Sequence, residues 1–127
     1  MNEYKVTISK RFSSEDIIDI ISSAIYDIGY WACINNDSEI WKSTSNSLPE
    51  DRTFEDVFFT ILKNGQSVEL LDTEDEDGPW ELTIEKLLHG IQLTINNGDW
   101  DGDMDMIDGE VGDIIFQYAL FGEIVYG

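Results

Sequence analysis

Apolar and polar residues alternate at the start of the chain, and apolar residues then recur every three or four positions. The alternation predicts a half-buried strand over residues 4–8. Its apolar members are Tyr4, Val6 and Ile8. An isoleucine-rich stretch with helical spacing follows Ser13 and ends at Gly29, and Ser13 with Asp16 has the pattern of a capping box. A strand followed by a helix is therefore predicted for this part of the chain.

The next segments predict a hairpin and a second helix. Residues 30–34 are rich in β-forming side chains, and after four turn-forming residues the segment 39–42 resumes an extended pattern. Residues 43–49 are polar and are expected to form a loop. Thr53 then begins a second capping box, and its helix runs to Lys63. The predicted core face of that helix consists of Phe54, Val57, Phe58 and Ile61.

The second half of the chain predicts two strands, two helices and a short final strand. The strands 68–72 and 79–82 flank an acidic turn, and Thr83 caps the helix that follows. After an acidic loop, a last helix is expected to stop at Gly122 and to be followed by a strand over 123–127. Its expected inward residues are Val111, Ile114, Ile115 and Tyr118.

The order of these elements indicates the fold class. Strands that come in pairs between helices favour an antiparallel sheet rather than a parallel one. We therefore predict an α+β fold, with an antiparallel sheet and three to four helices packed mainly on one face. At 127 residues, the chain has the size of one domain and shows no linker that would divide it, so residues 1–127 are expected to form a single domain.

Charge narrows the possible functions. The chain has 27 Asp and Glu against 7 Lys and Arg, for a net charge of −20. Such a field repels nucleic acids and anionic membranes, so direct binding to either is not expected. No apolar run is long enough to span a membrane, and residues 1–5 lack the basic and then apolar stretch of a secretory signal. Cys33 is the only cysteine. These features predict a protein of the cytoplasm.

No residue pattern indicates catalysis or a bound cofactor. His89 is the only histidine, and the chain lacks a GxSxG nucleophile motif and a phosphate-binding glycine loop. Carboxylates are so numerous that no particular pair stands out as an acid and base. We therefore expect a binding protein and not an enzyme, with no cofactor.

One acidic segment resembles a calcium-binding loop. Oxygen-bearing side chains at alternate positions, followed by a glutamate at the twelfth position, are typical of an EF-hand. The corresponding residues are Asp99, Asp101, Asp103 and Glu110. The sixth position should be glycine, but it is Met104. A metal site is therefore not favoured, and a solvated acidic loop is the preferred interpretation.

The acidic residues also gather in rows that suit a basic partner. Glu15 and Asp19 lie four positions apart on the first predicted helix, and two further acidic runs follow at 72–77 and 99–108. Trp100 stands among aspartates and could anchor a partner. The candidate partner-binding residues are Glu15, Asp19, Asp72, Glu74, Asp75, Glu76, Asp77, Asp99, Trp100, Asp101, Asp103 and Asp105.

Three segments resemble a known group of proteins. The stretch Trp80–Ile91, the pair Tyr30 and Trp31, and the ending QYALFGEIVYG are similar to an uncharacterised family of small acidic proteins from phages, prophages and mobile elements of low-GC Gram-positive bacteria. The resemblance covers most of the chain and implies a setting but no activity. Small acidic proteins in that setting resemble inhibitors of host defence, such as anti-CRISPR and antirestriction proteins.

These observations favour an inhibitor whose acidic, nucleic-acid-mimicking surface blocks a basic nucleic-acid-binding groove of a host protein. One alternative is a small-molecule or signal-nucleotide binding module, which could be a homo-oligomer. In this alternative the aromatic residues of the predicted strands and the segment 117–126 form the pocket. Another is a calcium-binding or structural accessory domain. The stripe formed by Gln117 and Phe121 is open to two interpretations, because a lone helix on a sheet need not bury it. It is expected to be either core or a subunit interface.

Overall fold

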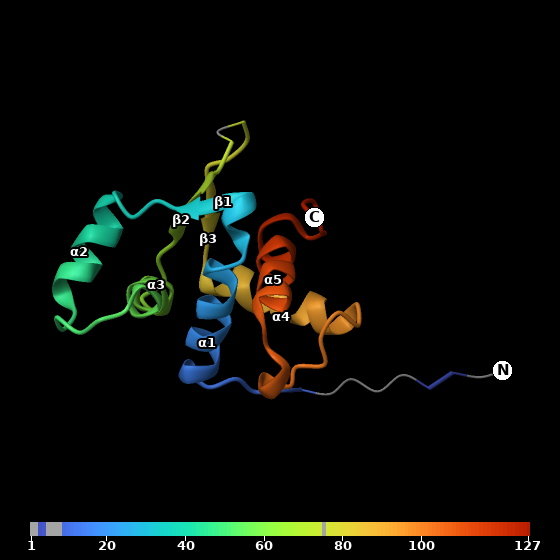
Figure 1. The fold of residues 1–127 in the computed structure, drawn as a ribbon. Coiled ribbons are helices and arrows are strands. Elements are labelled where there is room, and N and C mark those ends of the chain that lie inside the picture. Colours follow the sequence, from blue (N-terminus) through green and yellow to red (C-terminus); the bar gives the residue numbers. More distant parts are fainter. Residues whose placement is uncertain (1–2, 5–8, 75) are drawn as a thin grey trace.

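The computed structural model describes residues 3–4, 9–74 and 76–127, and this part of the chain has an α+β fold (Figure 1). The helices are α1 (Ser14–Ile25), α2 (Glu39–Ser47), α3 (Phe54–Lys63), α4 (Ile84–Asn96) and α5 (Gly109–Phe121). Two short 3₁₀ turns, Ile28–Tyr30 and Met104–Met106, join them. The strands are β1 (Ala32–Ile34), β2 (Val68–Asp72) and β3 (Trp80–Leu82). The predicted fold class is confirmed.

The three strands form one antiparallel sheet in the order β1-β2-β3. Val68 lies opposite Leu82 and Glu69 opposite Glu81 in the register of β2 and β3. Side chains alternate between the two faces of a strand, and Val68 and Leu82 are buried while Glu81 is exposed. The helices therefore cover the face that carries Val68 and Leu82, and the face that carries the two glutamates is left uncovered.

Helix α5 is the central element of the helical layer, because it packs against both α1 and α4. Two glycines allow these close approaches. A Cβ added at Gly90 of α4 would lie 2.6 Å from the Ile115 carbonyl oxygen, and one at Gly112 of α5 would lie 2.7 Å from the Ala24 nitrogen. Since neither backbone can move away cheaply, a larger residue at either position would overpack the layer.

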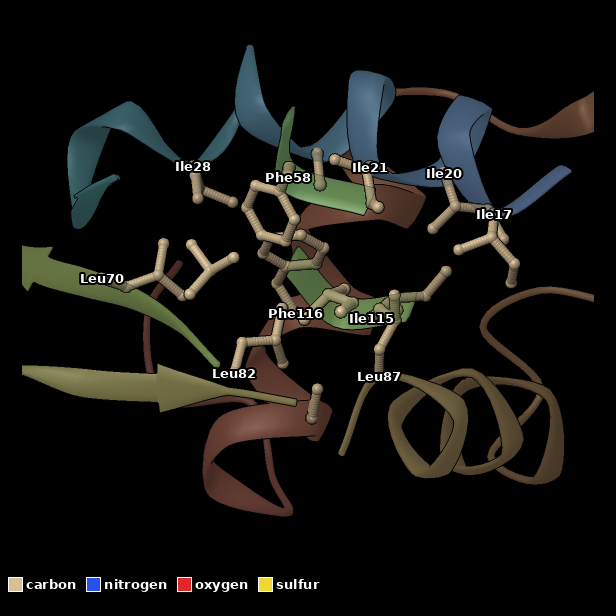
Figure 2. Packing of buried hydrophobic residues seen from close by; sticks show 14 of the residues in the cluster. Ile17, Ile20, Ile21, Ile28, Phe58, Leu70, Leu82, Leu87, Ile115 and Phe116 are labelled. Atoms are coloured by element: carbon tan, nitrogen blue, oxygen red, sulfur yellow. The ribbon is translucent and has the colours of Figure 1, made fainter. Parts of the chain in front are cut away.

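A single hydrophobic core joins the sheet to the helices (Figure 2). Side chains from α1, α3, α4 and α5 meet the sheet in it, and most of its members have no exposed surface. The residues labelled in the view are Ile17, Ile20, Ile21, Ile28, Phe58, Leu70, Leu82, Leu87, Ile115 and Phe116. The isoleucine stripe that predicts α1 from the sequence supplies four of these ten side chains.

Predictions that depend on local signals are confirmed. Both capping boxes form: Ser13 Oγ accepts from the Asp16 N–H at 3.1 Å, and Thr53 Oγ1 accepts from the Asp56 N–H at 3.1 Å. The strands β2 and β3 and the helix after Thr83 lie where they are expected. Gly122 ends α5 with φ of 73°, the left-handed conformation that glycine adopts without strain.

The predicted hairpin over residues 30–42 is wrong. Residues 39–47 form α2 instead of a strand and a loop, and β1 pairs with β2. Ser38 begins the helix, because its Oγ accepts a hydrogen bond from the Trp41 N–H at 3.3 Å. The Trp41 ring is buried beside Phe54 of α3, with centroids 4.5 Å apart, so tertiary packing favours the helix.

Two expectations at the ends of the chain also need comment. No strand forms over residues 123–127, because the Val125 and Tyr126 N–H groups donate to the Gln117 side chain and not to a neighbouring strand. The predicted strand over residues 4–8 falls mostly outside the described residues, and the described Tyr4 belongs to no strand. Within the described ranges, none of the helices has both the length and the apolar character needed to cross a bilayer.

Candidate functional site

A pocket with a volume of about 260 Å³ lies between the β2–β3 hairpin and the C-terminal segment. Both elements lie at the same end of the molecule, where the hairpin projects beyond the helices (Figure 1). We call it the hairpin pocket. Its lining combines aromatic rings with carboxylates: Tyr30, Trp31, Asp72, Glu74, Glu76, Asp77, Tyr126 and Gly127. Among the sequence-predicted candidates, it brings together four of the five from the first acidic run, while Asp75 lies outside the described residues.

Asp72 shapes the hairpin that presents these carboxylates. Its two oxygens accept backbone hydrogen bonds, from the Asp77 N–H at 2.7 Å and from the Glu74 N–H at 2.9 Å. These bonds, the one from Asp77 first, lower the pKa of Asp72 below its usual value. Glu74, Glu76 and Asp77 are exposed around this turn. The turn therefore holds four acidic side chains in a small region, and the carboxylate of Asp72 is bonded to the backbone of the turn.

Tyr126 forms the aromatic wall of the pocket. Its ring stacks on that of Trp31, with centroids 5.1 Å apart and an angle of 7° between the planes. Burial raises the pKa of the Tyr126 hydroxyl, and the nearby negative charges of Asp72 and Asp77 raise it further. The hydroxyl of Tyr126 therefore stays neutral beside the acidic hairpin.

A buried polar network fixes this wall. Gln117 of α5 is 1% exposed, and its Oε1 accepts from the Val125 N–H at 2.8 Å and from the Tyr126 N–H at 2.7 Å. Its Nε2 donates to the Tyr126 carbonyl at 3.0 Å and to Asp113 Oδ1 at 2.9 Å. The side chain of Gln117 thus makes the backbone hydrogen bonds that a neighbouring strand would make to the C-terminal segment.

Asp113, one turn earlier on α5, is the second member of the network. Its carboxylate is buried, and it accepts from the Tyr30 hydroxyl at 2.6 Å and from Trp31 Nε1 at 2.8 Å. Burial raises the pKa of Tyr30, and the hydrogen bond to Asp113 and the charge of that carboxylate raise it further, to about 12. The network therefore joins both aromatic residues of the segment 30–31 to α5.

The Tyr30 contact makes a testable prediction. The pKa of Tyr30 in the folded protein, about 12, lies above the ordinary tyrosine value of 10.0. The stabilisation from neutral Tyr30 is therefore complete below pH 10 and is lost as the pH rises toward 12. Absorbance titration of the phenolates should show a final transition near pH 12, later than that of the other tyrosines, and Tyr30→Phe should remove it. Asp113→Asn should bring that titration to lower pH, while titration of all tyrosines near pH 10 would contradict the network.

The remaining acidic candidates lie outside the hairpin pocket. Glu15 and Asp19 are exposed on α1, and none of the residues from the 99–108 run lines the pocket. In that loop, Asp101 Oδ1 accepts from the Asp103 N–H at 2.9 Å and Asp103 Oδ1 accepts from the Asp105 N–H at 3.0 Å. The acidic residues of α1, of the run 72–77 and of the run 99–108 therefore do not come together in the hairpin pocket.

Trp100, a candidate anchor for a partner because it stands among aspartates, is buried in the structure. The side chain is 5% exposed, its Nε1 donates to the Asp103 carbonyl at 3.0 Å, and its ring packs 5.8 Å from that of Phe12. Gly102, with φ of 86°, lets the loop turn back over the indole. Trp100 thus acts as the core of its own loop, which leaves little of the ring for contact with a partner.

The structure does not assemble the weak metal candidates either. Asp99 Oδ2 accepts from the Tyr118 hydroxyl at 3.1 Å, and Glu110 lies in the first turn of α5. In the part of the chain that the structure describes, no three side chains of His, Cys, Asp or Glu are placed so that they could hold a metal ion.

Sequence reasoning missed Asp113, and it proposed Gln117 only as part of a stripe or pocket and not as a neighbour of Asp113. Their signal was present, because two polar residues four positions apart interrupt an otherwise apolar helix and therefore share one face. The donors to Asp113, Tyr30 and Trp31, lie 83 and 82 positions away from it, a separation that periodicity cannot bridge.

Comparisons of the chain with protein-family models, with curated proteins and with solved structures find no match. The site is therefore interpreted from its own geometry and charge.

Proposed function

We propose that this chain is a binding protein whose acidic surface occupies the basic, nucleic-acid-binding surface of another protein, as an inhibitor of the antirestriction or anti-CRISPR type does. The hairpin pocket supports the proposal. It places Asp72, Glu74, Glu76 and Asp77 around two tyrosines in a concave site. A cation gains both from carboxylates and from the faces of aromatic rings, so this lining suits a lysine or arginine side chain.

The charge of the whole molecule supports the same function. A net charge of −20 on 127 residues exceeds the magnitude of about 2 to 8 that keeps a small domain in solution. Such a field accelerates the encounter with a basic surface and keeps nucleic acid away. The carboxylates of the hairpin then fix where the basic surface docks, because the hairpin itself projects beyond the helices (Figure 1).

Salt and substitution test the proposal together. A short arginine-rich peptide is expected to bind the protein at low salt, and its affinity should fall by roughly tenfold or more as salt rises through the physiological range. The triple variant Glu74→Gln, Glu76→Gln and Asp77→Asn should weaken binding and reduce the salt dependence. Isothermal titration calorimetry gives both quantities.

A matched control neutralises three other exposed carboxylates, at Glu50, Asp51 and Glu85. It has the same net charge as the hairpin variant and is expected to bind nearly as the unmodified protein does. Equal weakening by both triple variants would remove the hairpin from the proposal. Affinity that does not change with salt would contradict the proposed function itself. Competition between the protein and duplex DNA for a basic DNA-binding protein provides the functional readout.

A further inference from the structure

A second hollow lies at the end of α1, where β1 and the start of α3 meet. It has a volume of about 450 Å³, the largest of the hollows described for the molecule. Its lining is almost entirely apolar: Ile25, Tyr26, Ile28, Gly29, Ala32, Cys33, Ile34 and Phe54. Tyr26 is 80% exposed and Phe54 is 38% exposed. We call it the β1 groove.

Exposed aromatic rings around an apolar hollow need an explanation. Phe54 is partly accounted for, because its ring packs 4.5 Å from that of Trp41. Tyr26 follows the last turn of α1 and presents most of its ring to solvent. Apolar surface gathered around a hollow is typical of an interaction site, whereas single exposed apolar residues are not informative.

The uncovered face of the sheet adjoins this groove through Cys33. Cys33 pairs with Leu71 of β2, and both side chains lie on the same face as Glu69 and Glu81. Glu69 and Glu81 stand directly opposite each other in the ladder. Like charges in directly opposite positions of antiparallel strands repel each other, so a cation placed between them would remove a cost that the free protein carries. Asn35 Nδ2 donates to Glu69 Oε1 at 3.0 Å, which holds one of the two carboxylates in place.

None of the basic side chains that the structure describes lines the β1 groove. The cation nearest to Phe54 in the sequence is Arg52, and its guanidinium is used elsewhere. Its Nε donates to Ser45 Oγ at 2.7 Å, and its Nη1 donates to the Pro49 carbonyl at 3.1 Å. The apolar groove and the glutamate pair therefore form a surface that is hydrophobic on one side and acidic on the other.

We infer that the β1 groove and the Glu69–Glu81 pair form one docking surface for a basic amphipathic segment of the protein partner. An apolar side chain of that segment lies in the groove beside Tyr26 and Cys33, and a lysine or arginine lies between Glu69 and Glu81. The inference rests on the proposed function, which supplies a basic partner. It adds the apolar contact in the β1 groove, which does not depend on charge. A second copy of this chain is the less suitable occupant, because each copy carries a net charge of −20.

Two peptide probes separate the apolar contact from the electrostatic one. The first consists of lysines interrupted by leucines, and the second has glycine in place of each leucine, so that the two have equal charge. At high salt, where exposed charges are screened, the leucine peptide should bind about tenfold more tightly, because burying a leucine side chain is worth about one order of magnitude in affinity. When this peptide is added, the largest changes in the protein's amide NMR shifts should be at Cys33 and Ile34.

Substitutions locate the contact. Tyr26→Ser should remove most of the preference for leucine, and Tyr26→Phe should keep it. Glu81→Gln should weaken both peptides at low salt to a similar extent. The matched control is Glu85→Gln, an exposed glutamate on α4 outside the surface, and it should leave both affinities unchanged.

The outcomes distinguish this inference from the function on which it rests. Equal binding of the two peptides at high salt, or a leucine preference that Tyr26→Ser leaves intact, overturns the docking surface while salt-dependent binding still supports the proposed function. Failure of both peptides to bind at low salt overturns the two together. A dimer in solution that Tyr26→Ser dissociates would make a second copy the occupant, and it too would overturn the inference.

Discussion

Phe121→Ala is expected to lower the free energy of unfolding by about 3 kcal/mol and to leave the solution mass unchanged. The Phe121 ring belongs to an aromatic cluster within its own chain. Its centroid lies 5.2 Å from that of Trp80, 5.6 Å from that of Trp31 and 5.8 Å from that of Tyr126. The ring keeps some exposed surface, which places the expected loss at the lower end of the range for truncation of phenylalanine to alanine.

Denaturant unfolding and light scattering on the same variant measure both quantities. Ile124→Ala is a suitable control, because Ile124 lies three residues further along, is 46% exposed, and should change the free energy of unfolding by less than about 0.5 kcal/mol. A variant of Phe121 that keeps its stability but changes its mass would show that this stripe is a subunit interface. The sequence left two interpretations of the stripe formed by Gln117 and Phe121, core or subunit interface, and the packing supports the core.

The sequence correctly predicted the elements that depend on residues close together in the chain. Ser13 with Asp16 and Thr53 with Asp56 are complete signals within four positions, and both helices begin where these pairs place them. The alternation and turn residues around the acidic hairpin likewise sufficed for β2 and β3. In each case the partner that stabilises the element lies a few residues away, so the pattern contains the cause.

Elements that depend on distant partners were predicted less well. The segment 39–47 was predicted as a strand and a loop, and it becomes α2, in which Trp41 is buried against α3. Helix α5 was expected to bury one face, but α1 and α4 enclose it, so that Asp113 and Gln117 are buried as well. A periodicity argument assigns polar residues to the solvent side, and it fails where a hydrogen-bond network makes their burial favourable.

This limit applies to the candidate site as well. The acidic run 72–77 was identified from composition, and the strand aromatics with residues 117–126 were proposed as a pocket in the alternative function. Nothing in the sequence joined the two sets, because Tyr30, the acidic run and Tyr126 lie far from one another along the chain. The residues that position the two tyrosines are polar and buried, and their role follows only from the contacts. The most informative substitution therefore lies beneath the pocket and not on its acidic rim.

Gln117→Ala is expected to lower the free energy of unfolding by about 2 to 4 kcal/mol and to release the C-terminal segment. Its side chain makes four hydrogen bonds, to the N–H groups of Val125 and Tyr126, to the Tyr126 carbonyl and to Asp113. A buried polar group that loses its partner costs about 1 to 3 kcal/mol, and Asp113 keeps two of its three donors, which limits the total. Hydrogen exchange at the Val125 and Tyr126 amides should accelerate by more than the change in global stability requires.

The matched control is Gln92→Ala on the exposed side of α4, where the amide donates to Asn96 Oδ1 at 2.7 Å. That variant should stay within about 0.5 kcal/mol of the unmodified protein. Because Tyr126 is the wall of the hairpin pocket, Gln117→Ala should also weaken binding of the arginine-rich peptide, although it removes no charge and leaves every hairpin carboxylate in place. Loss of stability without loss of peptide binding would show that the network holds the fold alone. Loss of both, with exchange confined to the last residues, would show that the C-terminal segment is part of the binding site.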